Sequence, residues 1–156
     1  MRFFKRAEHP DSGPPSDEKV AAQMRYLAQV FVDGMAAQGE VLAWDTASAL
    51  RLDSLCEKLV TGKPGDETLP YLTAAMGAYL GELVVRNGRG RWVYSPEAKA
   101  PAVELPSGPG CYPQHKVAKR LNAGREHNLW AFYDYMMTGR IAPDVKVTPR
   151  EWSPPD

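Results

Sequence analysis

Cysteine is scarce in this sequence, which has two cysteines among 156 residues. Two cysteines are too few for a disulfide scaffold. Cys56 lies in an apolar pattern of helical spacing, and Cys111 lies in a loop rich in proline and glycine. We therefore expect two free thiols and a reducing compartment.

Long apolar runs are lacking too. No stretch approaches the roughly 20 apolar residues that are needed to cross a bilayer. The first six residues carry the basic charge of a signal peptide's start, but Ala7-Glu8-His9-Pro10 follows where an apolar segment would be required. These features predict a cytoplasmic protein without a membrane partner.

Neither sign of charge is in excess, because 19 lysines and arginines balance 19 aspartates and glutamates. General binders of polyanions carry a basic excess, so the balance argues against nucleic acid as a partner. The charges are unevenly distributed, with 8 basic and 11 acidic side chains in residues 1–78 and 11 and 8 in residues 79–156. Complementarity between the two halves within the fold is the favoured explanation, and a polar surface is the alternative.

Signatures of catalysis and of metal binding are missing from the sequence. His9, His115 and His127 have no second ligand at a metal-binding spacing, and Pro113 breaks the helical register between Cys111 and His115. No serine lies in a nucleophile-elbow pattern, and no glycine-rich segment has the flanking strand and helix of a phosphate loop. We expect no metal and no cofactor.

The patterns that are present predict an α+β fold, a mostly helical single domain with a small antiparallel sheet packed on a central helix. Residues 1–16 are expected to form a flexible leader, residues 17–139 a single globular domain, and residues 140–156 a proline-rich C-terminal tail. A chain of this length buries roughly two-thirds of the surface of its unfolded state.

Two helices are predicted before residue 62, from apolar residues three and four apart. The first begins near Asp17 and ends at Gly39. The second covers about 47–60, after Asp45 as the N-cap. Residues 40–44 between them are either a brief strand or an extended connector. The buried side of the second helix is predicted to consist of Leu50, Leu52, Leu55, Cys56 and Leu59.

A third helix is predicted from Thr68 to about Arg86, with Asn87 or Gly88 as its left-handed cap. Because Asn-Gly between apolar runs is also a strong turn signal, a hairpin over 84–94 is the alternative. The remaining expected elements are strands at 91–95 and 102–105, a loop at 106–113, and helices at 114–123 and about 125–138.

The third helix carries the most informative residues. Gly77 and Gly81 lie four apart on one face, so tight internal packing of another segment is expected there. Tyr79 and Glu82 are expected to be neighbours on the surface, with Glu82 and Arg86 as a solvated ion pair. In the alternative, Tyr79, Glu82 and Arg91 line a cleft over the sheet, and Glu82 acts as an acid or base.

The segment from 86 to 125 is basic, with eight basic side chains against Glu97 and Glu104. Its aromatic residues Trp92, Tyr94 and Tyr112 make single-stranded nucleic acid a possible ligand, since such binding combines phosphate neutralisation with base stacking. An acidic protein partner, or the acidic first half of the same chain, would satisfy these charges equally well.

Two segments resemble small uncharacterised proteins of actinomycetes. They are the Gly-Ala-Tyr-Leu-Gly-Glu helix of residues 77–82 with the tryptophan strand that follows it, and Lys-Arg-Leu-Asn-Ala-Gly at 119–124 before a helix with Phe-Tyr. The resemblance covers about residues 18–138. It implies a shared fold and no particular activity, because that family has no assigned catalytic residues to transfer.

These observations lead to three hypotheses of function. The first is a non-catalytic interaction protein of immunity or accessory type, which binds another protein through Tyr79, Glu82, Arg89 and Arg91. The second is an enzyme or small-ligand-binding protein with a cleft around Glu82. The third is weak binding of nucleic acid through the basic 86–125 segment.

Overall fold

The structure is a computed structural model that describes residues 13–108 and 110–139. The predicted tail over 140–156 and the leader up to residue 12 lie outside the described residues. The elements are α2 (Asp17–Ala37), α3 (Thr46–Thr61), α4 (Thr68–Gly88), β1 (Arg91–Ser95), β2 (Ala100–Glu104), β3 (Gly110–Cys111), α5 (Pro113–Ala123), the 3₁₀ turn η1 (Arg125–His127) and α6 (Leu129–Thr138). This arrangement confirms the predicted α+β class.

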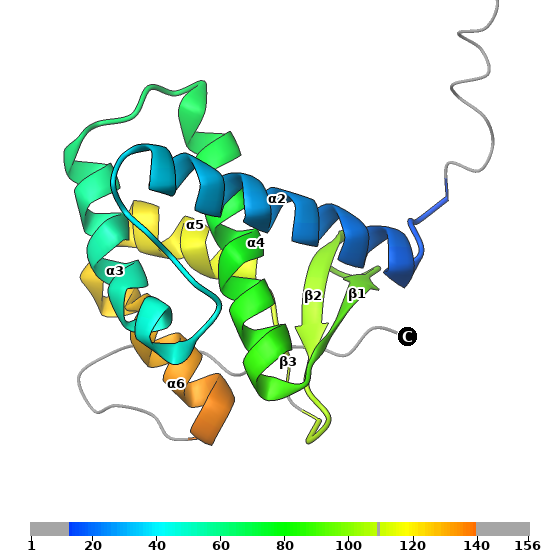
Figure 1. Ribbon diagram of the computed structural model, residues 1–156. Coiled ribbons are helices and arrows are strands. Elements are labelled where there is room, and N and C mark those ends of the chain that lie inside the picture. Colours follow the sequence, from blue (N-terminus) through cyan, green and yellow to red (C-terminus); the bar gives the residue numbers. More distant parts are fainter. Residues whose placement is uncertain (1–12, 109, 140–156) are drawn as a thin grey trace, which may run out of the picture.

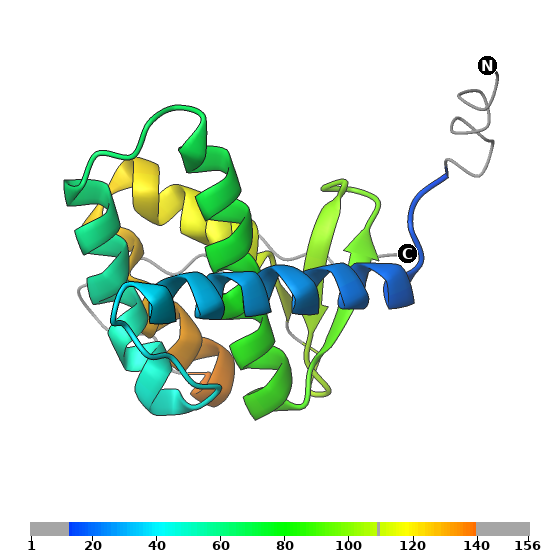
Figure 2. The ribbon, with the colours of Figure 1, turned by 45° about the horizontal axis from the view of Figure 1, so that its top comes forward.

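Helix α4 is the centre of the fold. Figure 1 shows α2 laid across α4, the sheet on one side of α4, and α3 and α6 on the other side. The view in Figure 2 shows that α2 also reaches β1. Residues Ala75 to Val84 are buried without interruption. Because neighbours surround α4 on every side, even its polar residues in this stretch are withdrawn from solvent.

The sheet has three antiparallel strands in the order β1-β2-β3. Arg91 pairs with Glu104 at one end of the first ladder, and Ser95 pairs with Ala100 at the other. The strand predicted at 91–95 is confirmed, and the second strand covers 100–104 instead of 102–105. Strand β3 lies in the segment that was predicted to be a loop. It is only two residues long, too short to show a periodic pattern.

Helix caps follow the expected chemistry at the first two helices. The Ser16 hydroxyl accepts the backbone N–H of Lys19 at the start of α2, and the Asp45 carboxylate accepts that of Ser48 at the start of α3. The segment between these helices forms no strand, so the extended connector is the correct alternative. Together the two caps confirm the predicted starts to within one residue.

Two local predictions in the helices were wrong. Leu50 is 52% exposed, because α3 buries the stripe that runs through Ala49, Leu52 and Cys56, and Leu50 lies beside that stripe. The segment predicted as one helix over 125–138 is divided into η1 and α6. The division falls at Asn128, whose side chain accepts the N–H of Ala131 and caps α6.

The end of α4 also differs from its prediction. The helix continues through Asn87 and Gly88, and the left-handed residue is Arg89, with φ of 59°. A Cβ at Gly88 would lie 2.8 Å from the Met137 methyl group. The Met137 side chain of α6 thus packs against the backbone at Gly88, and the chain turns one residue later. The alternative hairpin over 84–94 is not formed.

Candidate functional site

Glu82 is a buried carboxylate with structural partners. It is 2% exposed, and its two oxygens accept hydrogen bonds from Arg86 Nε at 2.9 Å and from Trp92 Nε1 at 2.8 Å. The predicted ion pair with Arg86 is present, but the expectation of a solvated surface pair was wrong. Glu82 lies on the part of α4 that the sheet covers, so its charge is held between the indole and the guanidinium.

Tyr79 is likewise a core residue and not the surface residue that was predicted. Its side chain is fully buried, and its hydroxyl donates a hydrogen bond of 2.5 Å to the carbonyl of Ala43. The ring centroid lies 5.4 Å from that of Phe31 and 5.2 Å from that of Trp44. Burial raises the pKa of Tyr79 to about 12. Tyr79 therefore joins α4 to the 40–45 connector.

Gly77 and Gly81 of α4 have the predicted role. A Cβ at Gly77 would lie 2.5 Å from the Cα of Gln114, and one at Gly81 would lie 2.2 Å from the Trp92 ring. Helix α5 and strand β1 thus approach the backbone of α4 at these two positions. The approach at Gly81 brings the Trp92 indole to the Glu82 carboxylate.

An arginine and a tryptophan are stacked where α4 emerges from the core. The guanidinium carbon of Arg86 lies 3.9 Å from the centroid of the Trp44 ring, and the Arg86 side chain is 41% exposed. Asn87 Nδ2 donates a hydrogen bond of 3.3 Å to the Trp44 carbonyl. Arg86 is therefore held by a carboxylate, an aromatic face and a neighbouring anchored loop while it remains open to solvent.

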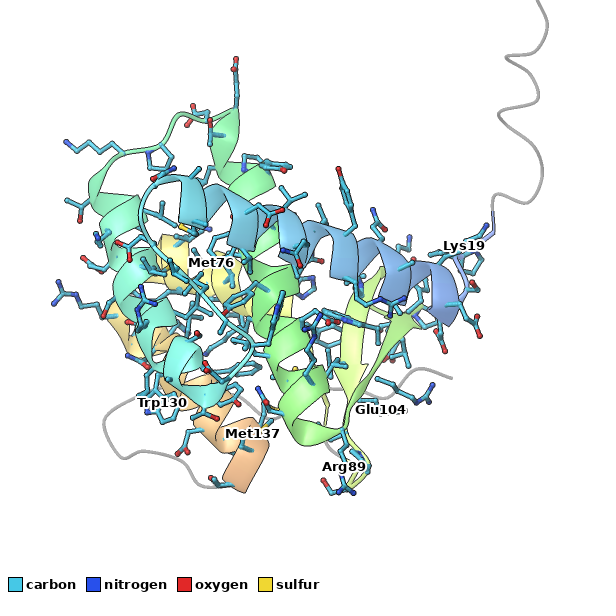
Figure 3. All side chains as sticks on the ribbon, viewed as in Figure 1. Lys19, Met76, Arg89, Glu104, Trp130 and Met137 are labelled. Atoms are coloured by element: carbon cyan, nitrogen blue, oxygen red, sulfur yellow. The ribbon has the colours of Figure 1, made fainter. Side chains whose placement is uncertain are left out.

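The other two predicted site residues are exposed but separately placed. Arg89 lies at the tip of the turn between α4 and β1, at the lower edge of the molecule in Figure 3. Arg91 forms ion pairs with Glu104 at 2.5 Å and with Asp17 at 3.6 Å. The four predicted residues thus divide into two core residues, one arginine with two acidic partners, and one exposed arginine. They do not form a single site.

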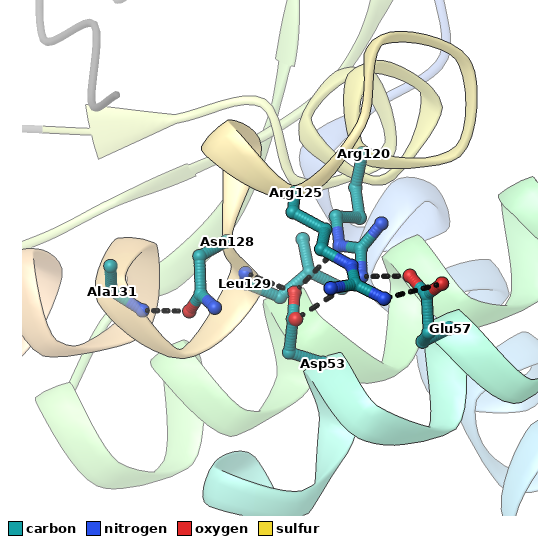
Figure 4. A network of polar contacts seen from close by, with 7 residues as sticks. All are labelled: Asp53, Glu57, Arg120, Arg125, Asn128, Leu129 and Ala131. Carbon is teal, nitrogen blue, oxygen red and sulfur yellow. Dashed lines mark hydrogen bonds and ion pairs between the residues drawn. The ribbon is translucent and has the colours of Figure 1, made fainter. Parts of the chain in front are cut away.

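Several arginines of the basic segment form ion pairs within the molecule. Arg120 is 3% exposed and bonds both Asp53 and Glu57 of α3, and Arg125 bonds Glu57 as well, as Figure 4 shows. Burial opposes the charge of Arg120, but its hydrogen bonds to the two carboxylates outweigh this and raise its pKa. The Arg120 hydrogen bond in turn lowers the pKa of Glu57. This network is the intramolecular complementarity that the charge distribution had favoured.

Two of the three aromatic residues in the basic segment are also taken into the fold. Trp92 and Tyr112 are buried, and Tyr94 is half-buried. Stacking of bases requires exposed ring faces. The structure therefore offers little support for the hypothesis of nucleic-acid binding through this segment.

Burial of Lys116 is expected to make the stability of the fold depend on pH. It is 2% exposed, and its ammonium nitrogen lies 5.6 Å from the centroid of the Phe132 ring. Burial lowers the pKa of Lys116 to about 8, and the charge of Lys119 adds to the shift. Between this value and the unfolded value of about 10.4, the unfolded state binds more protons, so stability rises with pH in that window and is lost as pH falls through 8.

We expect Lys116→Met to remove this rise. The free energy of unfolding of the native protein relative to the variant should increase by roughly 1 kcal/mol per pH unit between pH 8 and 10. Urea titrations at several pH values would measure it. Burial also raises the pKa of Cys56, to about 12, but that thiol titrates identically in both proteins. A pH-independent difference between them would contradict the prediction.

Hollows in the described part of the chain include two that are lined by residues other than Glu82. One of about 240 Å³ is lined by Ser107 and by residues 135–139, and one of about 350 Å³ is lined by Gly13, Pro14, Pro15, Tyr94, Pro96 and Lys99. Neither hollow includes Tyr79, Glu82, Arg86 or Arg89. The proposed cleft over the sheet around Glu82 is instead filled by the Trp92 side chain.

Residues 13–108 and 110–139 contain no group of three or more histidine, cysteine, aspartate or glutamate side chains that could hold a metal ion. Within the same residues, none of the helices combines the length and the apolar character that crossing a membrane requires. No protein-family model matches this chain, and no curated protein or solved structure shows significant similarity to it.

Proposed function

We propose that this protein acts without catalysis by binding another protein, in a cytoplasmic role of immunity or accessory type. The surface that binds the partner consists of Trp44, Arg86, Asn87 and Arg89, and we call it the Arg86 face. The carrying observation is that Glu82 uses both carboxylate oxygens to hold Arg86 and Trp92. The buried Glu82 carboxylate thus positions the exposed side chain of Arg86.

The geometry of the Arg86 face favours recognition. Arginine and tryptophan are the side chains that most often dominate the energy of protein interfaces. Ordering a long side chain at an interface costs about 0.5 to 1.5 kcal/mol. Arg86 is already ordered by its 2.9 Å bond to Glu82 and its stacking on Trp44. Binding at this surface therefore costs less side-chain entropy than binding to a mobile arginine would.

Site-specific crosslinking tests this function. A photoreactive lysine analogue would be placed at position 89 of the full chain, and at position 63 as the control. Both native residues are basic, exposed and left-handed, with φ of 59° at Arg89 and 53° at Lys63, and they lie beyond opposite ends of α4. In cells that make this protein, position 89 should yield a discrete crosslinked protein that position 63 does not yield.

The purified crosslinked protein should then bind the unmodified chain with a saturable heat signal in calorimetry. The same crosslinked products from both positions, or no saturable binding, would contradict the proposed function. A substrate that the purified protein turns over would contradict it as well.

A further inference from the structure

We propose that the Arg86 face recognises carboxylates, so that the partner presents an acidic segment of its chain to it. This inference rests on the proposed function and names the chemistry of the partner. It is carried by the unused donors of the two arginines and by the rigid placement of one of them.

Arg86 has hydrogen-bond donors that its contact with Glu82 does not use. Its Nε is bonded to Glu82, while among the described residues neither of its two Nη groups has an acceptor. A guanidinium presents five N–H donors in a fixed plane, and a pair of them fits the two oxygens of a carboxylate. Stacking on Trp44 at 3.9 Å fixes that plane. The arrangement is therefore suited to a planar anion that approaches the edge of the guanidinium.

Arg89 adds a second cation three residues further along the chain. It is exposed, and no acidic side chain of residues 13–108 or 110–139 is paired with it. The nearest acid in sequence to Trp44 is Asp45, whose carboxylate faces the start of α3 and accepts the N–H of Ser48. Asp45 and Glu82 are therefore engaged within the fold, while Arg86 and Arg89 are exposed.

A peptide fits this surface better than a nucleic acid does. Nucleic-acid binding draws its affinity from contacts to many phosphates and from stacking on exposed aromatic residues. The Arg86 face offers two arginines, and its single aromatic ring is already covered on one side by Arg86. Two arginines match a short run of glutamate or aspartate.

The backbone at Arg89 allows a variant that keeps the fold. A non-glycine residue at positive φ is strained, so Arg89→Gly removes the side chain and relieves that strain. Lys63→Gly is the matched control, because it removes one positive charge from a left-handed position at the other end of α4. Both variants should melt at or above the temperature of the native protein. Arg86→Lys keeps the charge beside Glu82 and removes the planar fork.

The experiment titrates the ¹⁵N-labelled full chain with an acetylated and amidated hexaglutamate peptide, with hexaglutamine and a thymidine dodecamer as further probes. NMR would follow the Arg86 side-chain Nε–H and the Arg89 backbone N–H. We expect hexaglutamate to shift both signals saturably. Its affinity should fall about fivefold in Arg89→Gly and in Arg86→Lys and stay unchanged in Lys63→Gly. Hexaglutamine should leave both signals in place.

Equal losses of affinity in Arg89→Gly and Lys63→Gly would overturn the inference, because binding would then follow overall charge. Tighter binding of the oligonucleotide than of hexaglutamate, or no shift with hexaglutamate, would overturn it too. These results are distinct from failure of the proposed function. A protein crosslinked from position 89 that binds the native chain, together with a failed hexaglutamate titration, would leave the function standing and remove the carboxylate chemistry.

Discussion

Arg120→Met is expected to lower the free energy of unfolding by about 3 to 5 kcal/mol, the range for removing one partner of a buried ion pair. Arg120 is buried on α5 and holds Asp53 at 2.8 Å and Glu57 at 2.8 Å on α3. The substitution leaves a partly buried Asp53 carboxylate without its cation. Urea unfolding followed by circular dichroism would measure the loss.

Position within the network, and not charge alone, causes the expected loss. Arg125 bonds the same Glu57, at 3.2 Å, but its side chain is 79% exposed. Arg125→Met should therefore change stability by less than about 1 kcal/mol, as exposed ion pairs do. Similar losses from both substitutions would show that the burial of Arg120 does not matter.

Asp53 gives the network a second role that a double-mutant cycle can detect. Its Oδ1 also accepts the backbone N–H of Leu129 at 2.8 Å, at the first residue of α6. The carboxylate therefore joins α3, α5 and α6. In an Asp53→Asn background the further loss from Arg120→Met should be smaller than in the native background, with a coupling of about 1 to 3 kcal/mol. Additive losses would mean that the two residues stabilise the fold independently.

Gly81→Ala is expected to lower the free energy of unfolding by about 2 to 3 kcal/mol or more, as overpacking of a tight core does. The added Cβ would lie 2.2 Å from the Trp92 ring and 2.9 Å from the Pro113 ring. The indole would have to move, and its hydrogen bond to the Glu82 carboxylate would be lost with it. Thermal unfolding would report the loss, and near-ultraviolet circular dichroism would report the displaced tryptophan.

Gly34→Ala is the matched control for this prediction. Gly34 lies within α2, and a Cβ there would meet no atom within 4 Å. An alanine in an open helical position stabilises by about 0.5 to 1 kcal/mol relative to glycine. Gly81→Ala should thus lower the free energy of unfolding, whereas Gly34→Ala should raise it. Stabilisation by Gly81→Ala would mean that α4 and β1 are not in close contact.

Much of the architecture could be predicted because local signals agreed with each other. Asp45 follows the connector and precedes an apolar stripe, which predicts a helix start, and its carboxylate does cap α3. Gly77 and Gly81 predicted the close approach of another segment, and Gln114 and Trp92 occupy those places. Helix periodicity and capping depend on residues within a few positions of one another, so the sequence carries them directly.

The candidate site was predicted less well, because exposure is not a local property. Tyr79 and Glu82 are polar and one turn apart, which is typical of a helix surface. Yet residues 75–84 of α4 are buried without interruption, and Tyr79 and Glu82 have partners from other segments. Trp44 lies 42 positions before Arg86, and no spacing rule predicts their stacking at 3.9 Å. Arg89, which is predicted to contact a partner, is exposed.

The amino-acid order by itself determined the class of fold, the helices and main strands, and the positions where glycine admits a neighbour, since these follow from backbone preference and periodicity. Only the tertiary structure decided which charges are used inside the molecule. It buried Glu82 and Arg120 against partners that are 10 and 63 or more positions away, and it left Arg86 and Arg89 facing solvent. The physical reason is that the cost of burying a charge depends on the partners that the packed helices bring to it, and those partners are distant in the chain.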